Sequence, residues 1–119
     1  MHNSMSDKTL EMVADRFRVL GDPVRLALLQ ALGTGELTVH ELTEAAGTSQ
    51  ANTSKHLGIL LRAGLVARRK EGLFVYYRAA DPEVFRLCDL VCGSLKDRLS
   101  RELSQLTDAP RRRPRSRTP

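Results

Sequence analysis

One stretch, residues 47–66, constrains the fold of this chain more than any other. Ser49 can cap the free amides of a helical first turn with its hydroxyl, and Gly64 supplies a left-handed residue at the far end. These signals predict a helix over residues 49–63. At 100° per residue, its apolar side consists of Thr53, Leu57, Leu60 and Leu61. The opposite side consists of Ala51, Lys55, Gly58 and Arg62, with Ser54 on its edge.

The outer side of this helix combines small residues, which let a partner approach closely, with two cations that would attract phosphate. Gln50 and Asn52 lie in the first turn, where their amides could reach the edge of a base. A buried anchoring side and a slim, basic, hydrogen-bonding outer side are what a DNA recognition helix requires. An ordinary solvated helix face is the alternative interpretation of the same residues.

Two runs rich in β-forming residues, 65–70 and 73–78, follow this helix directly and are joined by a Glu-Gly turn. Such runs around a glycine predict a β-hairpin. The first run ends in three cations, Arg68, Arg69 and Lys70, so the hairpin is basic. A recognition helix followed by a basic hairpin is the arrangement of a winged helix-turn-helix.

Three further helices are predicted upstream. The first covers about residues 6–20, where apolar residues follow helical spacing. The second starts at Asp22 and Pro23, a capping residue followed by proline at the first helical position. The third opens at a capping box of Thr38 and Glu41, and with the recognition helix it forms a helix-turn-helix. The residues expected to be buried in the second helix are Leu26, Ala27, Leu29, Ala31 and Leu32.

A long last helix is predicted from Asp81 and Pro82 onwards. Its apolar positions recur every three or four residues: Val84, Leu87, Cys88, Val91, Cys92, Leu95, Leu99, Leu103 and Leu106. Because the end of this stripe outruns the small domain, we expect it to pack against a second copy. The predicted fold is mainly α with a small β-hairpin (α+β), a winged helix-turn-helix that dimerises through the long C-terminal helix and the first helix.

The chain of 119 residues is predicted to form one domain, residues 7–107, with a flexible leader at 1–6 and a disordered Arg/Pro-rich tail at 108–119. Its net charge of +5 comes from the five arginines of that tail, because residues 1–110 carry 14 basic and 14 acidic side chains. A nucleic-acid face must therefore be a local patch. The tail either adds nonspecific phosphate affinity or is simply solvated.

Several functional classes are disfavoured. The sequence has no Gly-rich phosphate loop and no nucleophile elbow, and its three histidines, at positions 2, 40 and 56, are scattered, so we expect no enzyme. No run approaches the length of a membrane span, and the N-terminus has no signal-peptide core. We therefore expect a cytoplasmic protein with its cysteines as thiols. A winged-helix protein-interaction module without DNA binding is the alternative class, although the basic hairpin argues against it.

Three motifs, in this order and spacing, resemble the ArsR/SmtB family of small dimeric winged-helix repressors. They are Leu-Gly-Asp-Pro-Val-Arg-Leu at 20–26, Ser-Lys-His-Leu-x-x-Leu-x-x-Ala-Gly-Leu-Val at 54–66 and Gly-x-x-Val-Tyr-Tyr-Arg at 72–78. The resemblance covers about residues 10–100. It implies a homodimer that binds an operator near a promoter and is released by an inducer. A symmetric dimer would recognise an inverted repeat in double-stranded DNA.

The resemblance also implies DNA-contacting positions. Gln50, Ser54 and Lys55 match the base-contacting positions of the family, and the hairpin cations would contact the backbone or the minor groove. The full predicted DNA-binding set is Gln50, Ala51, Asn52, Ser54, Lys55, Arg62, Arg68, Arg69 and Lys70. Arg25 either meets phosphate or braces the fold. His56 is expected to be a packed, structural residue.

Two of the family's ligand sites are altered in this sequence. At the arsenic-type Cys-x-Cys site, Thr38 and His40 stand in place of the thiols. At the zinc-type site of the last helix, no imidazole remains, and zinc favours nitrogen and sulfur donors. The positions that match this second site are Asp81, Glu83, Ser94 and Asp97.

Cys88 and Cys92 are the remaining candidates for sensing. Their spacing of four places both sulfurs on one helical face. If that face lies near the dimer axis, two chains would bring up to four thiols together, which suits As(III), Cd(II), Pb(II) or Hg(II). It also suits redox or persulfide chemistry. The alternative is that both cysteines pack as small hydrophobic residues.

Overall fold

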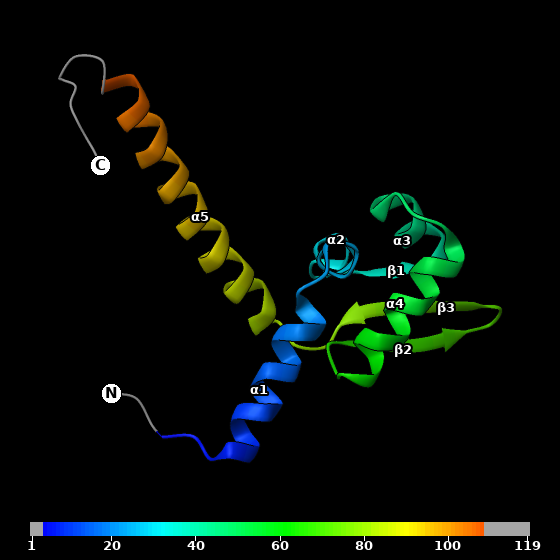
Figure 1. Ribbon diagram of the computed structural model, residues 1–119. Helices are drawn as coiled ribbons and strands as arrows, with labels where there is room; N and C mark the ends of the chain where they lie inside the picture. The colour runs from blue at the N-terminus through cyan, green and yellow to red at the C-terminus, as the bar shows by residue number, and fades with distance from the viewer. Residues whose placement is uncertain (1–3, 109–119) are drawn as a thin grey trace. The chain divides into compact units, whose positions relative to one another are not determined.

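A computed structural model of the chain describes residues 4–108. In chain order the elements are α1 (Asp7–Leu20), α2 (Pro23–Leu32), β1 (Glu36–Thr38), α3 (Val39–Ala46), α4 (Gln50–Arg62), β2 (Val66–Glu71), β3 (Phe74–Ala79) and α5 (Glu83–Asp108). The chain divides into two units at Pro82, and each is described by itself. In the first unit α2, α3 and α4 pack on one another, and the hairpin β2–β3 extends past β1 (Figure 1).

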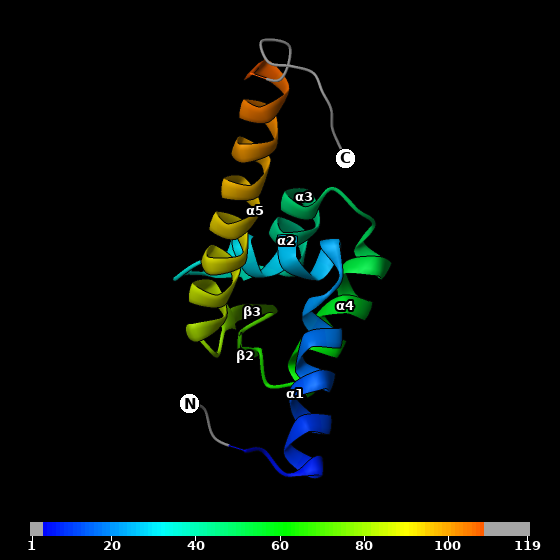
Figure 2. The ribbon, with the colours of Figure 1, turned by 60° about the vertical axis from the view of Figure 1, so that its left-hand side comes forward.

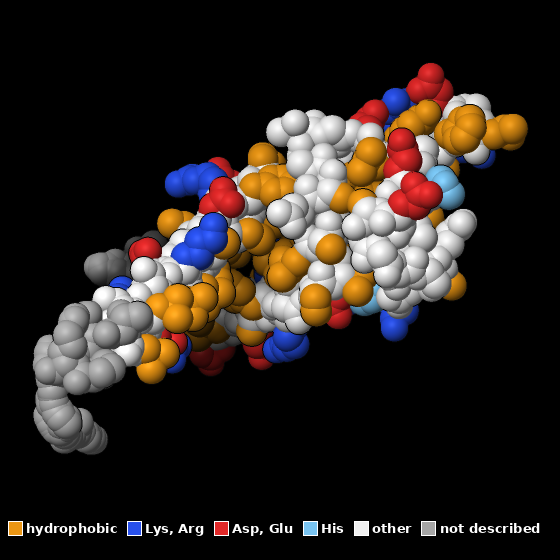
Figure 3. Space-filling model, turned by 90° about the horizontal axis from the view of Figure 1, so that it is seen from above, with side chains coloured by type: hydrophobic (Ala, Val, Ile, Leu, Met, Phe, Trp, Pro, Cys, Tyr) orange, Lys and Arg blue, Asp and Glu red, His pale blue; other side chains and the backbone are white. Residues whose placement is uncertain are grey.

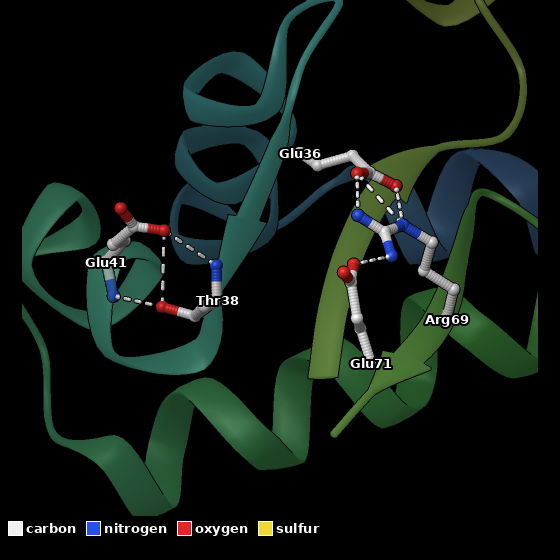
Figure 4. A network of polar contacts seen from close by, with 5 residues as sticks. All are labelled: Glu36, Thr38, Glu41, Arg69 and Glu71. Atoms are coloured by element: carbon white, nitrogen blue, oxygen red, sulfur yellow. Dashed lines mark hydrogen bonds and ion pairs between the residues drawn. The ribbon is translucent and has the colours of Figure 1, made fainter. Parts of the chain in front are cut away.

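The helices begin where local side chains satisfy their free amides. The hydroxyls of Ser6 and Ser49 accept from the backbone N–H groups three residues ahead, which starts α1 and α4. Asp22 accepts from two backbone N–H groups at the start of α2. Thr38 and Glu41 form the predicted capping box at the start of α3 (Figure 4). Each predicted helix start in this unit is therefore confirmed to within a residue.

The sheet has three antiparallel strands in the order β1-β3-β2, whereas the sequence predicted only the hairpin. β1 spans three residues and pairs with Tyr76, Tyr77 and Arg78 of β3. A strand this short has no alternating pattern of its own, and only its distant partner stabilises it. The part of the hairpin that carries Val75 and Phe74 pairs with β2 and not with β1.

Leucines from α2, α3 and α4, together with residues of the sheet, form the core of the first unit. The buried residues of this core are Leu28, Leu29, Leu32, Leu42, Leu57, Leu60, Leu65, Val66 and Tyr77. The expectation for α2 was partly wrong, because Leu26 is exposed and Leu28 is completely buried. Four leucines within seven residues leave the buried side of a helix ambiguous until its neighbours are known. Each completely buried leucine stabilises the fold by about 1.5–3 kcal/mol.

The second unit contains one continuous helix, α5 (Figure 2). Large apolar side chains are exposed along it: Leu90, Val91, Leu95, Leu99, Leu103 and Leu106 (Figure 3). Among the described helices, none combines the length and the apolar character needed to cross a membrane. Residues 1–3 of the predicted leader, which include His2, and residues 109–119 of the predicted tail, which include its five arginines, lie outside the described residues.

Candidate nucleic-acid interface

Helix α4 has the two sides that the sequence predicted. Thr53, Leu57 and Leu60 are buried, and His56 is buried beside them at 7 % exposure. The exposed residues of this helix are Gln50, Ala51, Ser54, Lys55 and Arg62. One helix therefore anchors itself in the core through one side and presents amide, hydroxyl and cationic groups on the other, as recognition of a base edge in the major groove requires.

The two amides in the first turn of α4, both predicted from the sequence to contact bases, have different environments. The Asn52 amide donates to the Thr48 hydroxyl at 2.9 Å and is half-buried. Gln50 is exposed, and within residues 4–108 its side chain has no hydrogen-bond partner. The Gln50 amide is consequently the better placed of the two to contact a base.

The two cations of α4 are electrostatically available. Over the described part of the chain, no carboxylate lies within ion-pair distance of Lys55 or Arg62. Gly58 lies between them, and a methyl group added at Gly58 would approach the Arg62 guanidinium to 3.3 Å. The middle of the exposed side therefore carries no bulky side chain, and a cation without an acidic partner lies on either side of it. This arrangement favours close approach of a polyanion.

Arg25 joins α2 to α1 and α4 through a set of contacts that we call the Arg25 brace. Its Nε donates to the Val19 carbonyl at 2.5 Å, and one terminal nitrogen donates to the Arg18 carbonyl at 3.3 Å. The other lies 3.0 Å from Nδ1 of His56. A guanidinium only donates, so Nδ1 of His56 is the acceptor in this hydrogen bond. Of the two roles that the sequence left open for Arg25, these contacts favour bracing the fold, and His56 is packed as expected.

Asp22 reinforces the same corner. The backbone N–H of Arg25 donates to the Asp22 carboxylate at 3.1 Å and that of Val24 donates at 2.8 Å. These bonds, together with the charge of Arg25, hold the pKa of Asp22 below its ordinary value. The carboxylate is therefore ionised in the folded chain at neutral pH.

In the hairpin β2–β3, which we call the wing, the three cations of β2 are divided between two faces. Successive residues of a strand point to opposite faces, so Arg69 projects away from Arg68 and Lys70. Arg69 donates from all three guanidinium nitrogens to the carboxylates of Glu36 and Glu71 (Figure 4). No described carboxylate pairs with Arg68 or Lys70.

The Arg69 contacts were not predicted from the sequence, which grouped this residue with the DNA-contacting cations. The pairing with Arg69 lowers the pKa of Glu36 and raises that of Arg69. The alternation of residues 66–71 was a signal that Arg69 faces away from its two neighbours. The partner Glu36 could not be found in this way, because it belongs to the unpredicted strand β1.

The cysteines lie on α5, where Cys88 is half-buried and Cys92 is exposed, and both are free thiols. Within residues 4–108 no group of three or more His, Cys, Asp or Glu side chains could hold a metal ion. At the altered arsenic-type position, Thr38 takes part in the capping box and His40 lies 3.5 Å from Glu44. The two cysteines are therefore the thiols that the described residues offer.

The fold and the exposed side of α4 define a class of protein, the winged helix-turn-helix DNA-binding domain. Residues 20–69 match a family model described as a helix-turn-helix domain. The homodimeric winged helix-turn-helix DNA-binding domain from Mycobacterium bovis superposes with a TM-score of 0.69 at 33% identity, over 84% of this chain and 95% of that one.

Curated relatives identify the family within this class. The "Transcriptional repressor SmtB homolog" of Synechocystis is 38% identical over 78% of this chain and 70% of its own length. The "Probable mercury resistance operon repressor" of Streptomyces lividans is 45% identical over 63% of this chain, a match that spans 58% of that protein. The chain belongs to the ArsR/SmtB family of winged helix-turn-helix transcriptional regulators, which are DNA-binding proteins and not enzymes.

Proposed function

We propose that this chain is a homodimeric transcriptional repressor that places α4 in the major groove of its operator. The observation that carries the proposal is the exposed side of α4, where Lys55 and Arg62 lack acidic partners among the described residues and Gln50 and Ser54 are exposed beside them. Arg68 and Lys70 of the wing would contact phosphate nearby. Two relatives, both named as repressors, support repression as the direction of regulation.

A second copy of the chain is the proposed partner. The exposed apolar residues of α5, and Leu10, Met12 and Phe17 of α1, amount to more apolar surface than a small monomer usually leaves in water. The homodimeric state of the relative from M. bovis supports the same assembly. A two-fold dimer would place two α4 helices in successive major grooves, so the operator would be an inverted repeat with half-sites about 10 base pairs apart.

DNA binding is tested by fluorescence anisotropy. The parent is used first to select an operator duplex from a random pool, and a mixed-sequence duplex serves as the reference. Gln50→Ala and Lys55→Ala should each weaken operator binding by about tenfold and lower the preference over the mixed duplex. Lys8→Ala, which removes the same charge from exposed α1, is the matched control and should bind like the parent.

Parent-like binding by the Gln50 and Lys55 variants would overturn the assignment of α4 as the recognition helix. A parent that binds no duplex even at low salt would instead favour the protein-interaction module.

Thiol chemistry at Cys88 and Cys92 is the proposed releasing signal. Their spacing on α5 and the exposure of Cys92 support it, and a relative named for mercury resistance suggests a thiophilic agent. Two thiols from each of two chains would suit As(III), Cd(II), Pb(II) or Hg(II), or a persulfide donor. In a reducing cytoplasm, the location we propose, both would rest as thiols.

The releasing signal is tested on the operator complex. Each agent is added to the parent and to a Cys88→Ser/Cys92→Ser variant, which should bind DNA equally well before addition. Release of the parent alone would assign the signal to the cysteines and name its chemical class. Equal behaviour of both proteins with every agent would leave the cysteines as packing residues.

A further inference from the structure

Arg69 is the cation of the wing whose charge is already neutralised within the protein. Its Nε lies 3.0 and 2.9 Å from the two carboxylate oxygens of Glu36, and a terminal nitrogen lies 2.9 Å from one of them. The other terminal nitrogen lies 2.5 Å from Glu71. Arg78 lies opposite Glu36 on β3, so two carboxylates and two guanidinium groups meet here and carry no net charge that would attract phosphate.

The cluster crosses the whole sheet. Arg69 belongs to β2 and Glu36 to β1, and β3 lies between these strands. The two outer strands are about 10 Å apart, twice the ordinary spacing, so only a long side chain can join them. Arg69 spans the gap over Tyr76 of β3, with its guanidinium carbon 4.8 Å from the ring centroid. We call these four residues the clasp: Glu36, Arg69, Glu71 and Tyr76.

The core supports the base of the hairpin, where Val66 and Tyr77 are buried, and the clasp lies where the hairpin loses its third strand. β1 pairs with β3 no further than Tyr76, and beyond this point the wing is two-stranded. An isolated two-stranded hairpin is marginally stable in water. On β2, Arg68 directly precedes Arg69, and Lys70 lies between Arg69 and Glu71. The direction of both cations therefore depends on how the clasp orients β2 relative to β1.

We propose that Arg69 is a positioning residue for DNA binding: through the clasp it orients the wing so that Arg68 and Lys70 meet phosphate, and it does not contact phosphate itself. This inference rests on the proposed DNA-binding function and goes beyond it. Within the basic run 68–70, it assigns phosphate contact to Arg68 and Lys70 and positioning to Arg69. Glu36, an acidic residue in a protein that binds a polyanion, becomes a residue that strengthens binding.

The effect of Glu36→Gln on DNA affinity has opposite signs for the two possible roles of Arg69. If Glu36 only shields Arg69 from DNA, the variant leaves Arg69 with the single carboxylate of Glu71, binds the mixed-sequence duplex more tightly and shows a salt slope steeper by about 2 for the dimer. If the clasp positions the wing, the variant binds about fivefold more weakly and its salt slope does not steepen. Glu44→Gln is the matched control, because it removes an exposed carboxylate from α3 in the same unit, and it should bind as tightly as the parent or more so.

A double-mutant cycle tests whether the clasp acts through Lys70. Lys70→Gln should weaken binding about fivefold in the parent and less than about twofold in the Glu36→Gln background, because its phosphate contact is already impaired there. Circular dichroism establishes that each variant is folded. If Glu36→Gln does not fold, Arg69→Lys replaces it, since lysine keeps the charge but cannot bridge both carboxylates, and it should also weaken binding about fivefold.

The outcomes separate the two proposals. Tighter binding by Glu36→Gln, parent-like binding by Arg69→Lys, or an equal cost of Lys70→Gln in both backgrounds would overturn the positioning role and leave the proposed function intact. A parent that binds no duplex at low salt would overturn the proposed function, and the positioning role with it.

Discussion

Replacing Arg25 with glutamine separates bracing of the fold from phosphate binding. The guanidinium makes three hydrogen bonds, to the carbonyls of Val19 and Arg18 and to Nδ1 of His56. A glutamine amide can replace one of them, so two are lost. At about 1 kcal/mol net for each bond, Arg25→Gln should lower the free energy of unfolding by about 2 kcal/mol. For a chain of this size, this corresponds to a fall of about 8 °C in the unfolding midpoint.

The assay combines thermal unfolding, followed by circular dichroism at fixed protein concentration, with anisotropy titrations of a mixed-sequence duplex at several salt concentrations. The brace predicts a lowered midpoint and an unchanged salt slope, measured at a temperature where the variant is folded. Arg86→Gln is the control, because Arg86 makes an exposed i,i+3 pair on α5 and should shift the midpoint by no more than about 2 °C. A parent-like midpoint for Arg25→Gln, with a salt slope shallower by about 2 for the dimer, would refute the brace and make Arg25 a phosphate contact.

Two further predictions concern single sites. Asp22→Asn keeps a capping group but removes a carboxylate whose folded pKa lies below its ordinary value of 3.8. The ionised carboxylate therefore stabilises the fold above about pH 4, and this contribution is lost as the pH falls through the folded pKa. The parent should be the more stable protein at pH 7 and the two unfolding midpoints should converge at acid pH, whereas parallel midpoints from pH 3 to 7 would contradict this linkage. Gly64 has a φ of +77° and nothing within 4 Å of an added methyl group, so Gly64→Ala should cost about 1 kcal/mol through backbone strain alone. Gly64→Asn should cost less because asparagine tolerates this conformation, and equal unfolding midpoints for the two variants would argue against strain as the cause.

The sequence predicted best what depends on neighbouring residues. Ser6, Asp22, Thr38 and Ser49 start helices through bonds to amides two or three residues ahead, and such bonds require no knowledge of the fold. The division of α4 into a buried and an exposed side was also predictable, because one helical period determines it.

Features that depend on distant residues were missed. β1 exists because β3 pairs with it, and the burial of Leu28 instead of Leu26 depends on which helices pack against α2. The hydrogen bond from Arg25 to His56 joins residues 31 positions apart, and the pair of Arg69 and Glu36 joins residues 33 positions apart. Neither contact produces a pattern in the local sequence. The sequence therefore could not decide between the two roles of Arg25, and it assigned Arg69 to DNA binding from its charge alone.

In the wing, a contact between distant residues changes the number of cations that are available to DNA. Counted by composition, strand β2 of each wing offers three cations to DNA, which makes six in a dimer. With Arg69 held by Glu36 and Glu71, each β2 strand offers Arg68 and Lys70, which makes four. Because the salt slope falls by about 0.9 for each phosphate contact removed, the two counts differ by about 2 in slope. Replacing both Arg68 and Lys70 with glutamine should therefore lower the slope by the whole contribution of the β2 strands, about 4 per dimer. Adding Arg69→Gln to that variant should lower it no further.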